Sequence, residues 1–294
     1  LVPWLANSAF KSVIDEASNA CNLDLTLHGT ESDADTIRDT AIAQPLIVAA
    51  GLASLAAISD EVGFPINKAD AVAGHSVGEI TAASLATIIS ESDAMKIVHA
   101  RGFEMAKAAA ITPAGMSAVL GGDREAVVSA INAAGLVAAN ENGAGQIVAA
   151  GSLEGLEKLA ANPPEGARVR ALAVAGAFHT SYMQPAIEPL RALAESIHVH
   201  DPIATIISNK DGARVTNGRE FMDRIVAQIA NPVRWDLCMS TLKSMGVTGV
   251  IELAPAGTLV GLLKRAEPSI ETFALKSPDD LDAAQTFASN HGSK

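Results

Sequence analysis

The stretch AVAGHSVGEITAASLATII, residues 71–89, places Ser76 between two glycines where an apolar run gives way to a helical pattern. Residues 70–76 have the length and apolar character of a buried strand, and the pattern predicts a helix from about residue 78 to residue 89. A G-x-S-x-G sequence between a strand and a helix is typical of a nucleophile elbow, a tight turn that exposes a reactive serine. We therefore predict that Ser76 is a nucleophile. The alternative is a serine that only caps the helix.

The residues around Ser76 fit the first interpretation. Gly74 and Gly78 lack side chains that would collide where strand and helix approach each other. The amide of Val77 lies at the start of the helix, where an oxyanion would form.

Helix and strand patterns alternate on both sides of this stretch. Residues 44–58 are apolar nearly all round and predict a buried helix, and Ser90 with Asp93 forms a capping box that opens another helix. Residues 204–209 and 250–255 predict further strands, separated by helical patterns. This order indicates an α/β fold, with a mainly parallel sheet covered on both faces.

The segment 114–176 has a different texture. Its patterns follow the order βαββαβ, with Ser152 as the cap of the second helix and residues 167–176 as the closing strand. That order is typical of a ferredoxin-like unit. We therefore expect an α/β-hydrolase-like large subdomain at 1–113 and 177–294, and an inserted ferredoxin-like small subdomain at 114–176.

Composition excludes several classes of function. The net charge is −12, which disfavours nucleic acid and anionic membrane surfaces as partners. Cys21 and Cys238 have no CxxC spacing, which disfavours a disulfide framework or a zinc site. We find no signal-peptide pattern and no apolar run of membrane-spanning length, so we expect a cytoplasmic protein without a membrane partner.

A nucleophilic serine needs a base, and His179 is the best candidate among seven histidines. It follows a strand pattern and precedes a helix, and such strand ends are where α/β sheets assemble their sites. His75 adjoins the serine and should project away from it, and His99 lies on a helix. The HVHD stretch at 198–201 could place two imidazoles together, but it lacks further ligand residues, and we predict no metal.

Arg101 falls on the apolar stripe of the helix that Ser90 opens. A buried arginine must be paired, because an uncompensated buried charge costs several kcal/mol. It could form an internal salt bridge with a structural carboxylate, or extend its head group to solvent. It could also clamp a substrate carboxylate with two parallel hydrogen bonds.

Together these residues resemble the malonyl-CoA:acyl carrier protein transacylases of type II fatty-acid synthesis and the acyltransferase domains of polyketide synthases. The resemblance runs from about residue 4 to residue 284. It rests on the motifs TAIAQPLIVAAG, GHSVGE, RGFEMAKAA, NGAGQIVAAG, GAFH, SNKDG, QIANPVRW and AGTLVGL.

The resemblance implies a role for each matching position. Ser76 would carry the acyl group, His179 would be the general base, and Val77 would supply an oxyanion amide. The remaining matches are Gln228, whose backbone carbonyl would orient the histidine, and four substrate-binding residues, Arg101, Met105, Phe178 and Gln44. Phe178 before the histidine and Val77 after the serine fit malonyl as the substrate. Asn140 and Asn142 match a motif to which we assign a structural role.

The implied reaction transfers malonyl from coenzyme A, through a malonyl-serine intermediate, to the phosphopantetheine thiol of holo acyl carrier protein. No cofactor is implied, and we expect a monomer. The carrier protein is acidic in this family, so docking on a chain of charge −12 would need a local basic patch. Lys264, Arg265 and Lys243 are candidates for it.

One departure concerns the start. The family begins with a strand and a GQG loop that supplies a second oxyanion amide, and this sequence begins after that point. Losing one oxyanion donor costs about 10²- to 10³-fold in rate, so we expect the chain as given to be impaired.

Two other functions remain open at this stage. A serine hydrolase or thioesterase of the α/β-hydrolase type shares the elbow, although it usually places its histidine near the C-terminus. A non-catalytic binding module could also have kept the fold.

Overall fold

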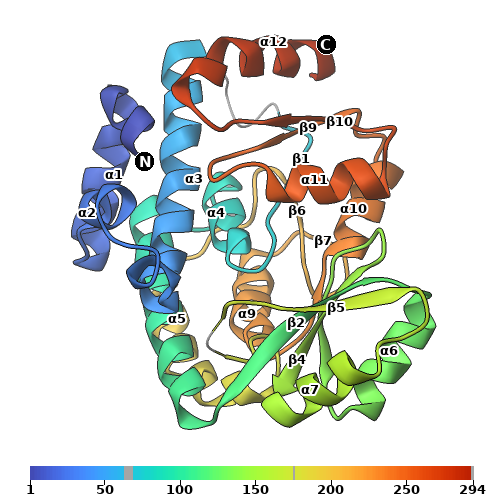
Figure 1. Cartoon of the computed structure of the whole chain (residues 1–294). Coiled ribbons are helices and arrows are strands. Elements are labelled where there is room, and N and C mark those ends of the chain that lie inside the picture. Colours follow the sequence, from blue (N-terminus) through green and yellow to red (C-terminus); the bar gives the residue numbers. More distant parts are fainter. Residues whose placement is uncertain (63–68, 175, 293–294) are drawn as a thin grey trace.

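The computed structural model describes residues 1–62, 69–174 and 176–292, and shows a mixed α/β protein in two parts. The larger part holds both termini, and the smaller part packs against one end of it (Figure 1). The predicted subdomains include residues 63–68, 175 and 293–294, which lie outside the described residues.

Helices dominate the first third of the chain. The elements are η1 (Val2–Ala6), α1 (Ser8–Cys21), α2 (Leu25–Thr30), η2 (Thr36–Arg38), α3 (Thr40–Val62), β1 (Ala71–Ala73), α4 (Gly78–Leu85) and α5 (Glu91–Ile111). As predicted, Ser90 caps α5, because its side chain accepts a hydrogen bond from the amide of Asp93. The helix after Ser76 ends at Leu85, four residues earlier than expected.

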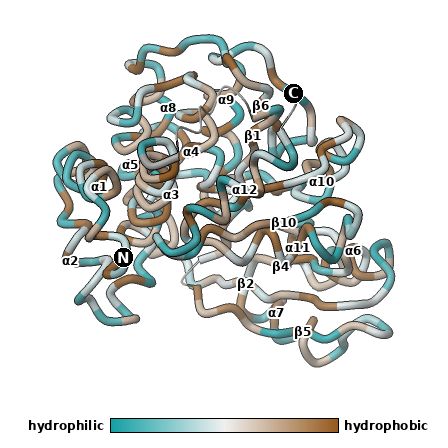
Figure 2. Tube along the Cα trace, turned by 90° about the horizontal axis from the view of Figure 1, so that it is seen from above, coloured by the Kyte–Doolittle hydropathy of each residue, from teal (hydrophilic) through white to brown (hydrophobic). Residues whose placement is uncertain are grey.

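The long helix α3 corrects one expectation from the sequence. Residues Thr40–Asp60 are long and apolar enough to cross a membrane, by length and composition. However, 61% of the apolar window is buried inside the protein. Seen from above, α3 lies between α1 and α4, and its trace is hydrophobic over much of its length (Figure 2). We therefore interpret α3 as a core helix.

The strands of the larger part form two short sheets among the described residues. In one, β1 pairs in parallel with β6 (Thr205–Ile207), and β6 pairs antiparallel with β7 (Arg214–Val215). In the other, β9 (Gly249–Glu252) and β10 (Glu271–Ala274) are parallel. The parallel pairing was expected, but the single mainly parallel sheet is not found. β1 ends at Ala73, just before the turn that carries Ser76.

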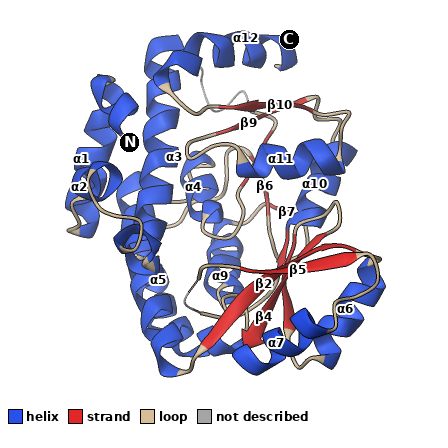
Figure 3. Cartoon of the chain, viewed as in Figure 1, coloured by secondary structure: helices blue, strands red, loops and turns tan. Residues whose placement is uncertain are grey.

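The smaller part has the predicted element order. Its elements are β2 (Ala114–Gly121), α6 (Arg124–Ala133), β3 (Val137–Glu141), β4 (Gln146–Ser152), α7 (Leu153–Ala161) and β5 (Ala167–Ala171). The strand order is β5-β2-β4-β3, and β8 (Val233–Arg234) from the larger part pairs in parallel with β3. Figure 3 shows β2, β4 and β5 beside the helices α6 and α7. The closing strand ends at Ala171, earlier than the predicted 167–176.

The two faces of this sheet have different partners. One face packs against α6 and α7 through a cluster that includes Val119, Ile147 and Leu159. The other face, which includes Met116 and Val148, packs against Phe178 and Tyr182 of the larger part. The segment just before His179 is therefore held between the two parts.

The remaining elements complete the larger part. They are η4 (Ser181–Ala186), α8 (Ile187–Ser196), α9 (Gly218–Gln228), α10 (Trp235–Ser244), α11 (Thr258–Ala266), η5 (Pro278–Asp280) and α12 (Leu281–His291). The helix predicted after His179 is divided into η4 and α8. Pro185, which has no amide hydrogen to donate, lies in η4.

Candidate active site

Ser76 occupies a strained turn between β1 and α4. Its φ is 51°, in the left-handed region that residues with a side chain rarely adopt. A Cβ on Gly74 would lie 2.0 Å from the carbonyl oxygen of Gly78, so only glycine fits at residue 74. The same argument is wrong for Gly78, where a Cβ would meet nothing within 4 Å. The strand and the helix therefore meet where Gly74 approaches the main chain of Gly78, and a side chain at residue 78 would point into open space.

His179 lies against the serine although 103 residues separate them. Its Nε2 is 2.8 Å from Ser76 Oγ, and its Nδ1 is 2.8 Å from the main-chain carbonyl oxygen of Gln228. Because a carbonyl only accepts, Nδ1 carries the proton and donates it. In the neutral ring, Nε2 is then unprotonated and directs its lone pair at the hydroxyl of Ser76. This is the arrangement of a general base.

The environment keeps this imidazole neutral. His179 is only 4% exposed. Burial, together with the positive charge of Arg101, lowers the pKa of His179 from its ordinary 6.5 to about 3. A neutral ring can accept the serine proton at neutral pH.

Arg101 points inward and contacts the same serine. It is 2% exposed, and its Nη2 donates to Ser76 Oγ at 3.2 Å and to Gln228 Oε1 at 2.9 Å. Its Nη1 donates to Gln44 Oε1. Burial lowers its pKa from 12.5 to about 10, and the charge of Glu79 opposes that shift. Neutral amide oxygens therefore hold a buried cation beside the nucleophile.

Arg101 has no ion pair with any residue that the structure describes, so the predicted alternative of an internal salt bridge is wrong. The side chain also does not extend to solvent. Its Nε is buried without a hydrogen-bond partner among the described residues. A buried arginine without a direct ion-pair partner next to a serine is suited to an anionic substrate group.

Met105 and Phe178 flank this cluster. Met105 lies one turn after Arg101, is buried, and its sulfur is 3.5 Å from Gln44 Nε2. Phe178 is half-buried and packs against both parts of the protein.

Two buried residues, Glu79 and Asn209, were not assigned a role from the sequence. Asn209 Oδ1 accepts from the amide of Ser76 at 2.7 Å, and its Nδ2 donates to the carbonyl of Gly74 at 2.8 Å. Glu79 accepts from the amide of Asn209 at 2.6 Å and from Gln228 Nε2. Both residues lie in motifs quoted above, GHSVGE and SNKDG, but nothing in the spacing indicates that these motifs meet.

The amides of the elbow differ in their availability. The Ser76 amide is occupied by Asn209. The Val77 amide, at the start of α4, has no acceptor among the described residues. Of these two, Val77 is the donor available to an oxyanion.

Three of the other histidines have different partners. His75 Nε2 is 2.8 Å from Asn142 Oδ1, and its ring packs edge-on against Trp235. This contact joins the elbow to the turn between β3 and β4. His198 and His200 contact each other, and no group of three or more metal-ligating side chains occurs within the described ranges.

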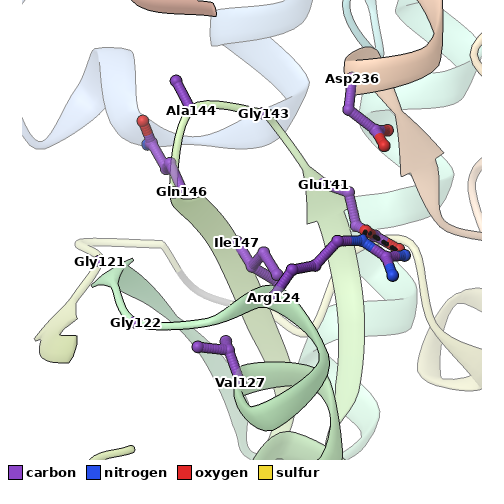
Figure 4. Close-up of a pocket in the computed structure, with 11 residues that line it drawn as sticks. Gly121, Gly122, Arg124, Val127, Glu141, Gly143, Ala144, Gln146, Ile147 and Asp236 are labelled. Carbon is purple, nitrogen blue, oxygen red and sulfur yellow. Dashed lines mark hydrogen bonds and ion pairs between the residues drawn. The ribbon is translucent and has the colours of Figure 1, made fainter. Parts of the chain in front are cut away.

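A separate pocket of about 250 Å³ opens in the smaller part (Figure 4). It is bordered by the β2–α6 and β3–β4 turns, with the Arg124–Glu141 ion pair along one side. It includes none of the residues that surround Ser76, so we do not assign the reaction to it.

The chain is similar to known acyltransferases over nearly its whole length. The sequence matches the family model described as an acyl transferase domain over residues 4–282. A protein of Mycobacterium bovis named malonyl CoA-acyl carrier protein transacylase is 50% identical over 282 residues, covering 96% of this chain and 93% of the relative.

Solved structures show the same fold. The crystal structure of MCAT from Mycobacterium tuberculosis has a TM-score of 0.92 at 49% identity, covering 97% of this chain and 94% of that chain. A malonyl-transacylase solved in complex with a type II PKS acyl-carrier protein has a TM-score of 0.88 at 26% identity, covering 96% and 94%. The chain belongs to the acyl transferase domain family, and within it to the malonyl CoA-acyl carrier protein transacylases.

Proposed function

We propose that this chain transfers a malonyl group from coenzyme A to the phosphopantetheine thiol of acyl carrier protein, through a malonyl ester on Ser76. The observation that carries the proposal is that the Arg101 guanidinium lies 3.2 Å from the serine oxygen that His179 can activate. The names of the relatives support the same substrate and the same acceptor.

The first half-reaction loads the serine. His179 Nε2 takes the proton from Ser76 Oγ, which attacks the thioester carbonyl. The Val77 amide stabilises the tetrahedral oxyanion. The C–S bond then breaks, and His179 returns the proton to the departing coenzyme A thiolate.

The second half-reaction runs the same steps with a different thiol. His179 removes the proton from the phosphopantetheine thiol, whose sulfur attacks the malonyl ester. The C–O bond breaks, Ser76 regains its proton, and the carrier protein leaves with malonyl. Gln228 holds the histidine tautomer through both half-reactions.

Arg101 selects the acyl group. A malonyl chain attached to Ser76 ends in a carboxylate, and the guanidinium beside Oγ can donate to it. Gln44 and Gln228 hold the guanidinium without neutralising it. Met105 and Phe178 would enclose the short chain between these groups.

The finer description of the fold is also part of the proposal. The strand order β5-β2-β4-β3 with two helices on one face supports a ferredoxin-like small subdomain at 114–176. The strand–elbow–helix unit around Ser76 supports an α/β-hydrolase-like large subdomain at 1–113 and 177–294. We further propose that the protein needs no cofactor and acts as a cytoplasmic monomer.

The rival function is hydrolysis of the acyl-serine. The names of the relatives favour transfer, and one of them is a malonyl-transacylase solved in complex with an acyl-carrier protein. The test mixes the protein with labelled malonyl-CoA, with and without holo acyl carrier protein. Transfer predicts label on the carrier protein. Release mainly as free malonate in both mixtures would support a hydrolase.

The proposed carrier-protein surface includes Lys264 and Arg265 at the end of α11. Neither forms an ion pair among the described residues, and Arg265 lies 3.4 Å from Gln146 of the smaller part. Lys243 is less suitable, because it pairs with Glu267 at 2.5 Å. Added salt should raise the KM for carrier protein, and replacing both Lys264 and Arg265 with alanine should weaken that dependence. An unchanged salt dependence would exclude this surface.

A further inference from the structure

Glu79 is a buried carboxylate that the reaction steps above do not use. It lies in the first turn of α4, three residues after the nucleophile, and is 1% exposed. It forms no ion pair among the residues that the structure describes, although Arg101 and Arg224 lie close enough to act on its charge. Burial raises its pKa to about 7. A carboxylate held in such a place is costly and calls for a role.

Its two oxygens have fixed partners. Oε1 accepts from the main-chain amide of Asn209 at 2.6 Å, and Oε2 accepts from Gln228 Nε2. The Asn209 amide belongs to the backbone and cannot reverse its polarity. Above about pH 7 the carboxylate is ionised and only accepts, so it then requires the NH₂ side of the Gln228 amide to face it.

The orientation of Gln228 decides what Arg101 meets. With Nε2 turned toward Glu79, the opposite atom, Oε1, accepts from Arg101 Nη2 at 2.9 Å. The reversed amide would place two donors, Nε2 and the guanidinium, against each other. The same Nε2 also donates to the carbonyl of Ser76 at 3.2 Å.

We propose that Glu79 is a positioning residue that fixes the Gln228 amide and thereby aims Arg101 at the malonyl carboxylate. The inference rests on the proposed function, since it gives Glu79 a part in malonyl selection. It acts through Gln228 and does not touch the substrate.

The substitution Glu79→Gln tests this directly, because it keeps the shape and changes one acceptor into a donor. The side-chain oxygen of the new glutamine must still accept from the main-chain amide of Asn209. Its NH₂ group therefore faces the side chain of Gln228 and forces the Gln228 amide to reverse. Arg101 then loses an acceptor and meets a donor. We expect the ratio of malonyl to acetyl transfer to fall about 10- to 100-fold, the range for an unsatisfied buried charged donor.

Acetyl transfer is the internal control, because an acetyl group has no carboxylate for Arg101 to hold. Glu188→Gln, which removes an exposed carboxylate on α8, is the matched control and should leave the ratio unchanged. Thermal unfolding of each variant shows whether it is folded. An equal loss of both activities, or an unchanged ratio, would overturn the proposal.

A second variant, Gln228→Ala, keeps the proposal testable if Glu79→Gln does not fold. Gln228→Ala removes the amide and keeps the main-chain carbonyl that holds His179, so it should lower the ratio by a similar factor. Adding Glu79→Gln to Gln228→Ala should then change the ratio no further. An unchanged ratio in Gln228→Ala, or a further fall in the double variant, would contradict the coupling. If wild-type protein forms no malonyl-Ser76, the proposed function fails; if it does and only the ratios disagree, the role of Glu79 alone fails.

Discussion

The main-chain carbonyl of Gln228 accepts a hydrogen bond from Nδ1 of His179 at 2.8 Å, while its side-chain oxygen accepts from Arg101 at 2.9 Å. One residue at the end of α9 therefore holds both the base and the cation that face Ser76. It sets the tautomer of the histidine with its backbone and the position of the arginine with its side chain. Acylation and selection of the acyl group are joined at this residue.

Arg101→Ala should abolish malonyl transfer selectively. Removing the partner of a buried carboxylate costs about 3 to 5 kcal/mol, or about two to four orders of magnitude in rate. Acetyl transfer should be spared or improved, because that group is uncharged. The measurement is kcat/KM for both acyl-CoA substrates, with Arg191→Ala, a partly exposed arginine on α8, as control. An equal slowing of both substrates would show that Arg101 is not the clamp.

His179→Ala should slow the loading of Ser76 by about 10² to 10⁴-fold, the usual contribution of a general base. The readout is single-turnover acylation by malonyl-CoA. His198→Ala changes an exposed histidine outside the site and should react at the wild-type rate. If the two variants acylate equally fast, another group removes the serine proton.

His179 should also make the fold sensitive to acid. Its pKa is about 3 in the folded protein and returns to the ordinary 6.5 on unfolding, so protons bind more strongly to the unfolded chain. This contribution to stability is complete above pH 6.5 and is lost as pH falls toward about 3. The free energy of unfolding of wild type should therefore fall more steeply below about pH 6 than that of His179→Gln. Parallel pH profiles would show that His179 is not held neutral by the fold.

The two glycines of the elbow should respond oppositely to alanine. Gly74→Ala places a Cβ 2.0 Å from the Gly78 carbonyl oxygen. We expect this overpacking to lower the free energy of unfolding by about 1 to 3 kcal/mol and to remove acylation by moving Ser76. Gly78→Ala meets nothing within 4 Å and should leave stability unchanged or raise it by up to about 1 kcal/mol. Thermal and denaturant unfolding decide the matter; similar losses in both variants would refute this geometry.

Local patterns were the most informative part of the sequence. The caps at Ser90 and Ser152 and the order of elements from β2 to β5 are found as predicted, since they depend on neighbouring residues. Ser76 was identified because a strand, a tight turn and a helix leave a readable pattern. The place of Arg101 on an apolar stripe likewise indicated an inward-facing charge.

Long-range contacts were harder to foresee. No spacing rule indicates that Asn209 accepts a hydrogen bond from the amide of Ser76, 133 residues earlier in the chain. Nor does any rule indicate that Glu79 accepts a hydrogen bond from the side chain of Gln228. Periodicity also does not show how far a strand pairs, so the short separate sheets were missed. The free space at Gly78 depends on the direction of a single Cβ, which becomes known only once the turn is built.

The most direct test of the account is the mass of the intact protein after exposure to malonyl-CoA, followed by peptide mapping. We predict one malonyl adduct on Ser76, absent from Ser76→Ala and discharged by holo acyl carrier protein with malonyl appearing on its phosphopantetheine. The account would be contradicted if Ser76 carries no adduct, or if the adduct is lost to water at the same rate with and without the carrier protein.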